Sequence, residues 1–429
     1  MKVSANGRYL VTDDGKPFFY LGDTAWNLFY HVTYEDAARY VDNRHEKRFT
    51  VIMPCLVREG GIANAVNEYG ERPFVDDDPT KPNEGFFRHI DKVIDYIDRK
   101  GMYTALLPTW GEYVGPLNNK PGPVLFDTNT ARAYGRFLGE RYGTKNMIWV
   151  IGGDRNPDGP ERIAVYRAFA AGIKEGDGGR NLMTFHPGGQ HSSGEWFHDE
   201  PWLDFHMMQT GTAWDLDNET WIWKEYNKTP PKPVLDGETR YENSREIFSP
   251  PYAGRKMTPH QVRKAAYNAM LAGAFGHTYG CRDVWDHYVP GVVRPTVRNT
   301  DTDWKVAMDF PGAWQLGIMV GFFTRYKWYE LEPDQENTLV PQARRRRSMG
   351  LVSAMSRDRK HGLIYVPERM RVAPDVSALG AKSATVRWFN PASGFYHYIG
   401  EISAGEPVVV EPPELSEAPD HVLILEKKA

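Results

Sequence analysis

Two acidic residues of this chain lie where a short apolar run gives way to glycine. Asp154 follows the run at residues 147–151 through two glycines, and Glu238 follows the run at 233–236 through one. Glycine allows the backbone to turn sharply at such a point. A facing pair of carboxyl groups is what hydrolysis of a glycosidic bond needs, because one acid protonates the leaving oxygen while the other carboxylate acts at the anomeric carbon. Asp154 and Glu238 are therefore the predicted catalytic residues, although Asp154 taken alone could simply cap a turn.

Further polar and aromatic residues follow other apolar runs and are candidates for binding a substrate. Aromatic faces with a polar tip suit sugar rings, which carry apolar C–H faces and hydroxyl edges. A single aromatic residue at such a place packs in the core as often as it binds a sugar. A histidine there more often makes a structural hydrogen bond. The predicted substrate-binding residues are Asp23, Trp26, Trp110, Glu112, His186, His206, Asp236, Tyr241, Tyr279 and Trp285.

A repeated pattern of a short apolar run followed by a helical segment must position these residues. The runs are continuous rather than alternating, as in parallel strands that are covered on both faces. The turns into the runs are short and the connections after them are long, which predicts a (β/α)8 TIM barrel over residues 1–333 with its site at the carboxyl ends of the strands. The predicted strands cover residues 18–22, 49–54, 103–108, 147–151, 182–186, 203–208, 233–236 and 274–279.

The competing fold is a doubly wound open sheet. That fold predicts a glycine-rich phosphate loop after the first strand, whereas this chain has Gly22-Asp23-Thr24-Ala25-Trp26 there. The barrel is therefore favoured. Its helices are predicted at 86–100, after the capping residues Thr33 and Thr258, and at 312–326.

The last part of the chain, residues 334–429, has a different pattern. Short runs with strand character are separated by turn residues, which predicts a small β-sandwich packed on the barrel. The predicted strands cover residues 351–355, 362–366, 384–389, 408–410 and 422–425. A short β extension is expected at 1–16, and the arginine run at 344–347 is expected to be a solvated or ion-paired surface.

These motifs resemble glycoside hydrolase family 140, the apiosidase-like barrels, over nearly the whole chain. Gly22 to Trp26 is similar to the opening strand of that family, and the segment 152–157 is similar to the one that supplies its general acid. Asp236-Gly237-Glu238 is similar to the segment that supplies its nucleophile. A glutamine usually follows the tryptophan that corresponds to Trp285 in this family, and here the residue is Asp286. This departure bears on which sugar is bound.

The resemblance implies an exo-acting β-apiosidase-like glycosidase that removes terminal apiose, a branched pentofuranose, from plant pectin side chains or plant glycosides. Many retaining barrel glycosidases carry the acid/base and the nucleophile at strand ends four and seven, and this analogy favours retention, with Glu238 as nucleophile and Asp154 as acid and base. Inversion, with Glu238 as a general base, stays open, because the sequence does not set the distance between the carboxyls. The tail resembles a small domain that is often labelled collagen-binding-like, and this label does not by itself predict collagen binding.

Composition excludes several other classes of partner. Lysine plus arginine is 52 against 56 acidic residues, so we expect no nucleic-acid partner. No apolar run reaches the length of a membrane span, and we expect no membrane partner. Residues 1–10 lack the apolar core of a signal peptide, so the expected location is cytoplasmic, with a secreted or periplasmic protein whose signal was removed as the alternative. We expect a carbohydrate substrate and a monomer or weak homo-oligomer.

We expect no cofactor and no catalytic metal. His186, His206, Asp154 and Glu238 could surround a zinc ion, but the chain contains no His-Glu-x-x-His motif. Two other hypotheses remain open at this point. One is a non-catalytic carbohydrate-binding or matrix-adhesion protein that acts through its tail, and the other is a metal-dependent hydrolase barrel, which elemental analysis would distinguish.

Overall fold

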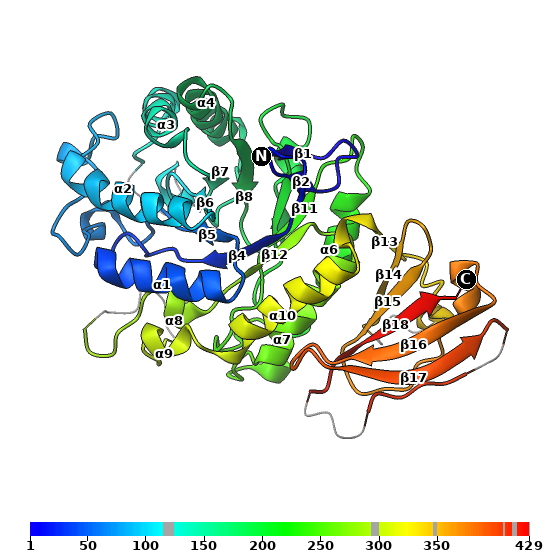
Figure 1. Ribbon diagram of the computed structural model, residues 1–429. Coiled ribbons are helices and arrows are strands. Elements are labelled where there is room, and N and C mark those ends of the chain that lie inside the picture. The colour runs from blue at the N-terminus through cyan, green and yellow to red at the C-terminus, as the bar shows by residue number, and fades with distance from the viewer. Residues whose placement is uncertain (115–123, 293–299, 346–349, 406–407, 414–417, 429) are drawn as a thin grey trace.

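The computed structural model describes residues 1–429 except 115–123, 293–299, 346–349, 406–407, 414–417 and 429. The chain forms an α/β barrel followed by a separate antiparallel sheet (Figure 1). Before the barrel, a three-stranded antiparallel sheet is formed by β1 (Lys2–Val3), β2 (Leu10–Val11) and β3 (Pro17–Phe18).

Eight parallel strands line the barrel, and each overlaps one of the predicted runs. All of their residues are buried except Tyr103, which explains why the runs are continuously apolar. They are β4 (Tyr20–Thr24), β5 (Val51–Met53), β6 (Tyr103–Leu106), β7 (Met147–Gly152), β8 (Leu182–His186), β10 (His206–Gln209), β11 (Val234–Glu238) and β12 (Gly276–Tyr279).

The barrel sheet is nearly closed. Strand β12 pairs with β4, and the full order is β8-β7-β6-β5-β4-β12-β11-β10-β9, where β9 (His191–Ser192) runs antiparallel to β10. Across the remaining seam, the Asp204 amide donates to the Met183 carbonyl at 2.9 Å and the Thr184 hydroxyl donates to the Phe205 carbonyl at 2.7 Å. These bonds draw β8 towards the start of β10.

Helices cover the outside of the barrel. Thr33 caps the first helix through its side chain, and Thr258 forms a capping box with Gln261, so both predicted starts are confirmed. The helices are α1 (Tyr34–Glu46), α2 (Glu84–Arg99), α3 (Thr128–Tyr142), α4 (Pro160–Asp177), α5 (Gly194–Phe197), α6 (Asn218–Tyr226), α7 (Pro259–Leu271), α8 (Arg282–Trp285), α9 (Trp304–Ala307) and α10 (Pro311–Arg325).

The C-terminal part is one antiparallel sheet, so the prediction of a two-sheet sandwich is wrong for the described residues. The sheet order is β13-β14-β15-β18-β16-β17. Its strands are β13 (Leu331–Pro333), β14 (Val352–Ser356), β15 (His361–Val366), β16 (Ser383–Phe389), β17 (Tyr396–Ser403) and β18 (His421–Lys427). The run predicted at 408–410 contributes only an isolated bridge between Val410 and Val372. The side chains of the arginine run at 344–347 lie outside the described residues.

Both faces of this sheet are buried, and this explains why its strands resemble those of a sandwich. Side chains alternate between the two faces of a strand. Leu363, Tyr365, Val422 and Ile424 belong to the core shared with the barrel. Their neighbours on the opposite face form a second core, covered by α11 (Pro341–Arg345) and by the 3-10 turn η7 (Val376–Leu379), and include Ile364, Val366, Leu423 and Leu425.

Helices α7 and α10 lie between the barrel and the C-terminal sheet (Figure 1). The segment Trp304–Arg325 is long and apolar enough to cross a membrane by composition alone. In this fold its residues Leu316, Met319 and Phe322 are buried, and the Phe322 ring stacks on Phe389 with centroids 4.4 Å apart. Packing against the barrel and the sheet therefore accounts for its apolar character.

A buried ion pair joins α7 to the C-terminal sheet. Arg263 Nε donates to Asp420 Oδ2 at 2.9 Å, and the Tyr365 hydroxyl donates to the same oxygen at 2.9 Å. The two charged side chains are 4% and 0% exposed. Removing one partner of such a pair leaves an uncompensated buried charge.

We therefore expect Asp420→Ala to lower the free energy of unfolding by about 3–5 kcal/mol. Glu401→Ala is the matched control, because Glu401 pairs with Lys428 at the surface of the same sheet. This variant should lower the free energy of unfolding by less than about 1 kcal/mol. Denaturant unfolding of both variants measures the difference. Equal, small losses would mean that the pair does not hold the sheet to the barrel.

Candidate active site

Asp154 is placed by a sharp turn at the end of β7. Gly152, Gly153 and Asp154 all have positive φ, at 103°, 128° and 53°. A Cβ on Gly152 would come within 2.4 Å of the His186 carbonyl oxygen, and one on Gly153 would lie 3.0 Å from Trp110 Cα. Glycine is therefore required at both positions. Asp154 itself is held in the left-handed region, which costs on the order of 1 kcal/mol or more and is common at functional sites.

His186 lies between Asp154 and Glu238. The Asp154 amide donates to His186 Nδ1 at 3.3 Å, and His186 Nε2 lies 2.9 Å from Glu238 Oε2. Nδ1 therefore accepts a hydrogen bond, and Nε2 is the ring nitrogen next to the Glu238 carboxyl. The ends of β7, β8 and β11 thus meet at one imidazole, which contacts the backbone amide of Asp154 on one side and the Glu238 carboxyl on the other.

The environment of Asp154 favours its protonated form. Burial is the largest cause that raises the pKa of this carboxyl, and the negative charge of Glu238 raises it further. Arg155 opposes them, since its Nη1 lies 2.7 Å from Asp154 Oδ2, yet the pKa remains raised. A carboxylic acid beside an 11% exposed carboxylate is an arrangement that can donate a proton to a leaving group.

Aromatic side chains surround His186. The Trp26 ring lies edge-on to Trp110 and to His186, with centroids 5.2 Å and 5.5 Å apart. Trp26 Nε1 donates to the Tyr241 hydroxyl at 3.3 Å. Both burial and the adjacent Glu238 raise the pKa of Tyr241 well above its usual value, so it stays a neutral phenol. The structure thus brings Trp26, Trp110, His186 and Tyr241 together with the two carboxyls.

The structure does not bring Asp23 and Tyr279 to this site. Asp23 is fully buried and bonds to Arg44 and Tyr40, which are both on α1. The Tyr279 hydroxyl donates to Glu242 Oε2 at 2.6 Å, and the ring lies beside Arg44. Both side chains face the helix layer rather than the barrel mouth, because alternate residues of a barrel strand point outwards.

His206 and Asp236 are also directed towards helices. His206 lies 3.1 Å from Glu225 Oε2 of α6. Asp236 accepts from the Thr210 hydroxyl at 2.9 Å and from Asn218 Nδ2 at 2.9 Å, and it is fully buried. The substrate contacts predicted for these two residues are therefore replaced by structural contacts. Among the described residues, His206 pairs with Glu225 and does not form a metal-binding group with His186, Asp154 and Glu238.

Two further predicted residues support the loops beside the site. The Trp285 carbonyl accepts from the Asn27 amide at 3.0 Å, next to Trp26, and Asp286 Oδ1 accepts from Asn27 Nδ2 at 2.7 Å. Glu112 Oε1 accepts from the amides of Gly60 and Gly61 at 2.9 Å and 3.2 Å. Asp286, the residue at which this chain departs from the family pattern, therefore orients the loop that carries Trp26.

Glu59 is a third carboxyl at the site that the sequence did not identify. It follows β5 in the loop that Glu112 holds, and burial raises its pKa to about 7, with further contributions from Asp154, Glu112 and Glu238 and opposition from Arg155. Its position after the second strand was the signal available in the sequence. Gln209, which hydrogen-bonds the Asp154 carboxyl, was also missed because the predicted strand stopped one residue earlier.

We expect Glu59→Gln to stabilise the protein at alkaline pH. A carboxyl whose pKa rises from 4.5 to about 7 on folding binds more protons in the folded state, so stability falls as pH rises through that window. Glutamine is neutral throughout, and the variant should gain about 1–3 kcal/mol over wild type at pH 8 and little at pH 5. Unfolding at both pH values measures this gain.

Glu68→Gln, in the exposed part of the same loop, controls for the change of net charge. If the two glutamine variants gain equally at pH 8, Glu59 is not held in a buried, acidic environment.

No metal-binding group is apparent in the part of the chain that the structure describes. Within those residues, no cluster of three or more His, Cys, Asp or Glu side chains is arranged to hold an ion.

Comparison with known proteins identifies the family. Residues 4–330 match the family model described as the apiosidase-like catalytic domain. This chain belongs to the apiosidase-like family. Residues 333–426 of the apiosidase-like chain match a second model, described as "Putative collagen-binding domain of a collagenase". No curated protein sequence matches the chain significantly.

Solved structures of glycoside hydrolases are similar to this apiosidase-like protein over almost its whole length. One described as a glycoside hydrolase has a TM-score of 0.86 at 28% identity and covers 99% of this chain and 96% of its own. Another, described as a glycoside hydrolase family 5 protein from Bacteroides vulgatus, has a TM-score of 0.87 at 28% identity and covers 99% and 93%. The apiosidase-like protein is a glycoside hydrolase.

Proposed function

We propose that the protein is an exo-acting, retaining β-apiosidase-like enzyme that works without a cofactor. It removes terminal apiose from plant pectin side chains or plant glycosides, with Glu238 as nucleophile and Asp154 as acid and base. The observation that carries the proposal is that the Asp154 amide and the Glu238 carboxyl both contact His186, with the pKa of the Asp154 carboxyl raised by burial and by Glu238.

The reaction proceeds in two displacements. A Glu238 carboxylate oxygen bonds to the anomeric carbon while the bond from that carbon to the leaving oxygen breaks, and Asp154 gives its proton to this oxygen. A water molecule then loses a proton to Asp154, and its oxygen bonds to the anomeric carbon as the ester bond to Glu238 breaks. Both carboxyls return to their starting states.

The neighbours of the pair support these roles. His186 Nε2 lies 2.9 Å from Glu238 Oε2, and the other carboxyl oxygen is the one that attacks in this mechanism. Trp26 and Trp110 offer apolar surface for the C–H face of a sugar ring. Arg155 and Gln209 contact the Asp154 carboxyl and fix its direction. Residues that hold reacting groups in one geometry contribute to rate by orientation.

The loops after β5, β6 and β7 support exo action. Backbone hydrogen bonds join them one to the next: Leu56 to Leu107 at 2.9 Å, Trp110 to Val57 at 2.8 Å and Gly111 to Gly153 at 2.9 Å. These bonds make one continuous wall beside Asp154. A wall on one side of the carboxyl pair favours binding of a chain end over binding of the middle of a chain.

A panel of glycosides tests the proposal. Apiose-bearing plant glycosides and the nitrophenyl β-apioside are compared with nitrophenyl arabinofuranosides, mannosides and glucosides, and kcat/KM should be at least about 100-fold higher for the apiosides, a difference of roughly 2.7 kcal/mol in transition-state binding. Preferred cleavage of another sugar would overturn the apiose assignment. Failure to cleave any glycoside would favour the alternative of a carbohydrate-binding protein.

A further inference from the structure

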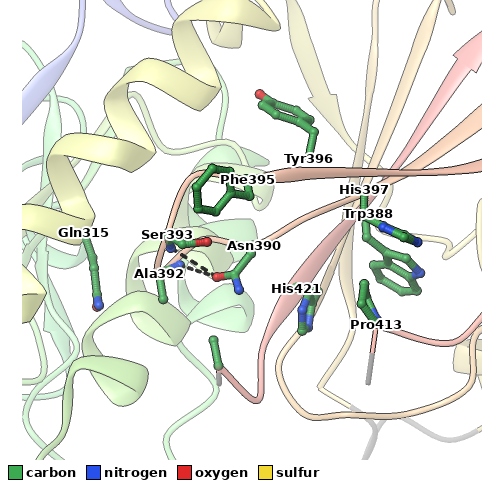
Figure 2. Close-up of a pocket in the computed structure, with 11 residues that line it drawn as sticks. Gln315, Trp388, Asn390, Ala392, Ser393, Phe395, Tyr396, His397, Pro413 and His421 are labelled. Atoms are coloured by element: carbon green, nitrogen blue, oxygen red, sulfur yellow. Dashed lines mark hydrogen bonds between the residues drawn. The ribbon is translucent and has the colours of Figure 1, made fainter. Parts of the chain in front are cut away.

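Polar side chains without a partner inside the protein differ in whether a ligand can reach them. A cavity of about 710 Å³ lies where the C-terminal sheet meets the barrel, and Trp388 and His421 line it (Figure 2). Their unpaired ring nitrogens are closed off from solvent, so a molecule in this cavity does not contact them. Glu59, the third carboxyl at the active site, differs because its side chain is only partly buried and its carboxyl oxygens are not closed off in this way.

The backbone on both sides of Glu59 is fixed by the loop after β6. The carbonyls of the two residues before it accept from the Trp110 amide and the Tyr113 hydroxyl, both at 2.8 Å. The amides of the two glycines after it donate to Glu112 Oε1 at 2.9 Å and 3.2 Å. The place of Glu59 is therefore set before a substrate binds, as is required of a group that orients a substrate.

The charged groups that act on Glu59 are those of the catalytic centre. The negative charges of Asp154 and Glu238 both act on its carboxyl, and Glu112 adds a third. Arg155 opposes them, but this cation is already paired with Asp154 at 2.7 Å. A group within electrostatic range of both catalytic carboxyls lies beside the sugar whose anomeric carbon is held between them.

Among the residues that the structure describes, the Glu59 carboxyl makes neither a hydrogen bond nor an ion pair. Burial raises its pKa from 4.5 to about 7, because the folded protein disfavours the charged form. A carboxyl that loses water without gaining a hydrogen bond lowers the stability of the fold. Such a cost is typical of functional sites, where a ligand supplies the missing hydrogen bonds.

The hydroxyl groups of a sugar are suitable partners for this carboxyl. Its two oxygens lie side by side, so the ionised form accepts from two neighbouring hydroxyls, and the protonated form donates to one and accepts from the other. A uronate would instead add a further negative charge beside Asp154, Glu238 and Glu112, which disfavours its binding. The described carboxyls are also not grouped to hold a metal ion. The surroundings of Glu59 therefore favour a neutral sugar.

We propose that Glu59 is a substrate-binding residue, whose carboxyl binds two neighbouring hydroxyl groups of the sugar that is held between Asp154 and Glu238. The two hydrogen bonds fix the rotation of the ring and so aim its anomeric carbon at the catalytic carboxyls. The substrates are then glycosides whose terminal sugar is neutral and has free hydroxyls on adjacent carbons. This proposal rests on the proposed catalytic pair and not on apiose as the sugar.

Two variants of Glu59 are compared on the nitrophenyl glycoside that has the highest kcat/KM in the panel described above. Glu59→Ala should lower kcat/KM about 100-fold, because both hydrogen bonds are lost. Glu59→Gln keeps an acceptor and a donor side by side, and should lose less than about tenfold. Glu68→Ala, in the exposed part of the same loop, is the matched control and should leave kcat/KM unchanged. Thermal unfolding checks that each variant is folded. Equal losses in the two Glu59 variants would mean that only the charge acts, and would overturn the proposal.

Monodeoxy derivatives of the same glycoside identify the hydroxyls that Glu59 binds. For such a hydroxyl, the loss of kcat/KM on its removal should be about tenfold smaller in Glu59→Ala than in wild type, because the interaction is already absent. If every deoxy derivative loses the same factor in both proteins, Glu59 binds none of these hydroxyls and the proposal is wrong.

The glycosyl fluoride of the same sugar separates contacts with the sugar from contacts with the leaving group. Fluoride leaves without a proton and carries no further sugar or aromatic ring, so Glu59→Ala should lose the same factor on the fluoride as on the nitrophenyl glycoside. A loss that is absent with the fluoride would make Glu59 an acid or a contact of the leaving group, which overturns the proposal. Failure of the proposed function would instead appear in Glu238→Ala or in the sugar preference of wild type.

Discussion

Replacing Glu238 with alanine is expected to lower kcat by about four to six orders of magnitude on every substrate, because the variant lacks the carboxylate that is proposed to bond to the anomeric carbon. The protein should still fold, since Glu238 makes few contacts besides those with His186 and Tyr241. Initial rates with the nitrophenyl β-apioside and thermal unfolding measure the two effects. Glu140→Gln, at an exposed ion pair on α3, is the control for an acidic residue without a catalytic role.

Azide distinguishes a nucleophile from a residue that only supports the site. In Glu238→Ala, azide can occupy the space that the carboxylate leaves and attack the anomeric carbon from the same face. Turnover should recover in part, and the glycosyl azide should carry the configuration opposite to that of the substrate. If Glu238→Ala keeps more than about one per cent of wild-type kcat without azide, Glu238 is not the nucleophile.

The barrel could be predicted from the sequence because its strands are buried on both faces. Every predicted run overlaps a strand, and the glycines before Asp154 marked the turn that places it. Continuous burial also concealed which side each strand residue faces. Asp23 and Asp236 were assigned to the mouth by their position near strand ends, whereas their side chains pair with helix residues. A run without alternation contains no information on this point.

The number of C-terminal sheets and one of their strands were also not predicted from the sequence. Its short strands separated by turn residues suggested a sandwich, although they form one sheet whose faces pack on the barrel and on α11 and η7. Strand β17 was not predicted, because an edge strand with mostly exposed residues such as Tyr396 and Tyr398 lacks the apolar signal. Glu59 was not predicted as a site residue because it lies in a long loop whose path depends on Glu112.

Asp154→Ala should have an effect that depends on the leaving group. On an apiose-bearing plant glycoside, whose leaving oxygen needs a proton, loss of the acid should lower kcat/KM by about 10²–10⁴-fold. With an activated nitrophenyl leaving group, formation of the glycosyl-enzyme should change far less, and azide should restore turnover by replacing the water that Asp154 activates. The product of that rescue should keep the substrate configuration, because azide then attacks the ester to Glu238.

The pH dependence of wild type and of Asp154→Ala adds an independent test. Burial and the charge of Glu238 raise the pKa of Asp154, so the wild-type enzyme should lose activity as pH rises through this raised pKa. This fall of kcat/KM at alkaline pH, the alkaline limb of the pH profile, should be absent in Asp154→Ala with the nitrophenyl substrate. Persistence of the limb in the variant would assign the acid to another group, of which Glu59 is the nearest candidate by charge and burial.

The configuration of the first-formed sugar then decides between the two possible roles of Glu238. Retention requires carboxyl groups about 5–5.5 Å apart, and inversion requires about 6.5–9.5 Å to admit a water molecule. The negative charge of Glu238 raises the pKa of Asp154, so the two carboxyls lie within electrostatic range of each other, and the two-displacement mechanism proposed above requires the shorter separation. Proton NMR recorded before mutarotation should show the retained anomer. An inverted anomer would make Glu238 a general base that activates water, with no covalent intermediate.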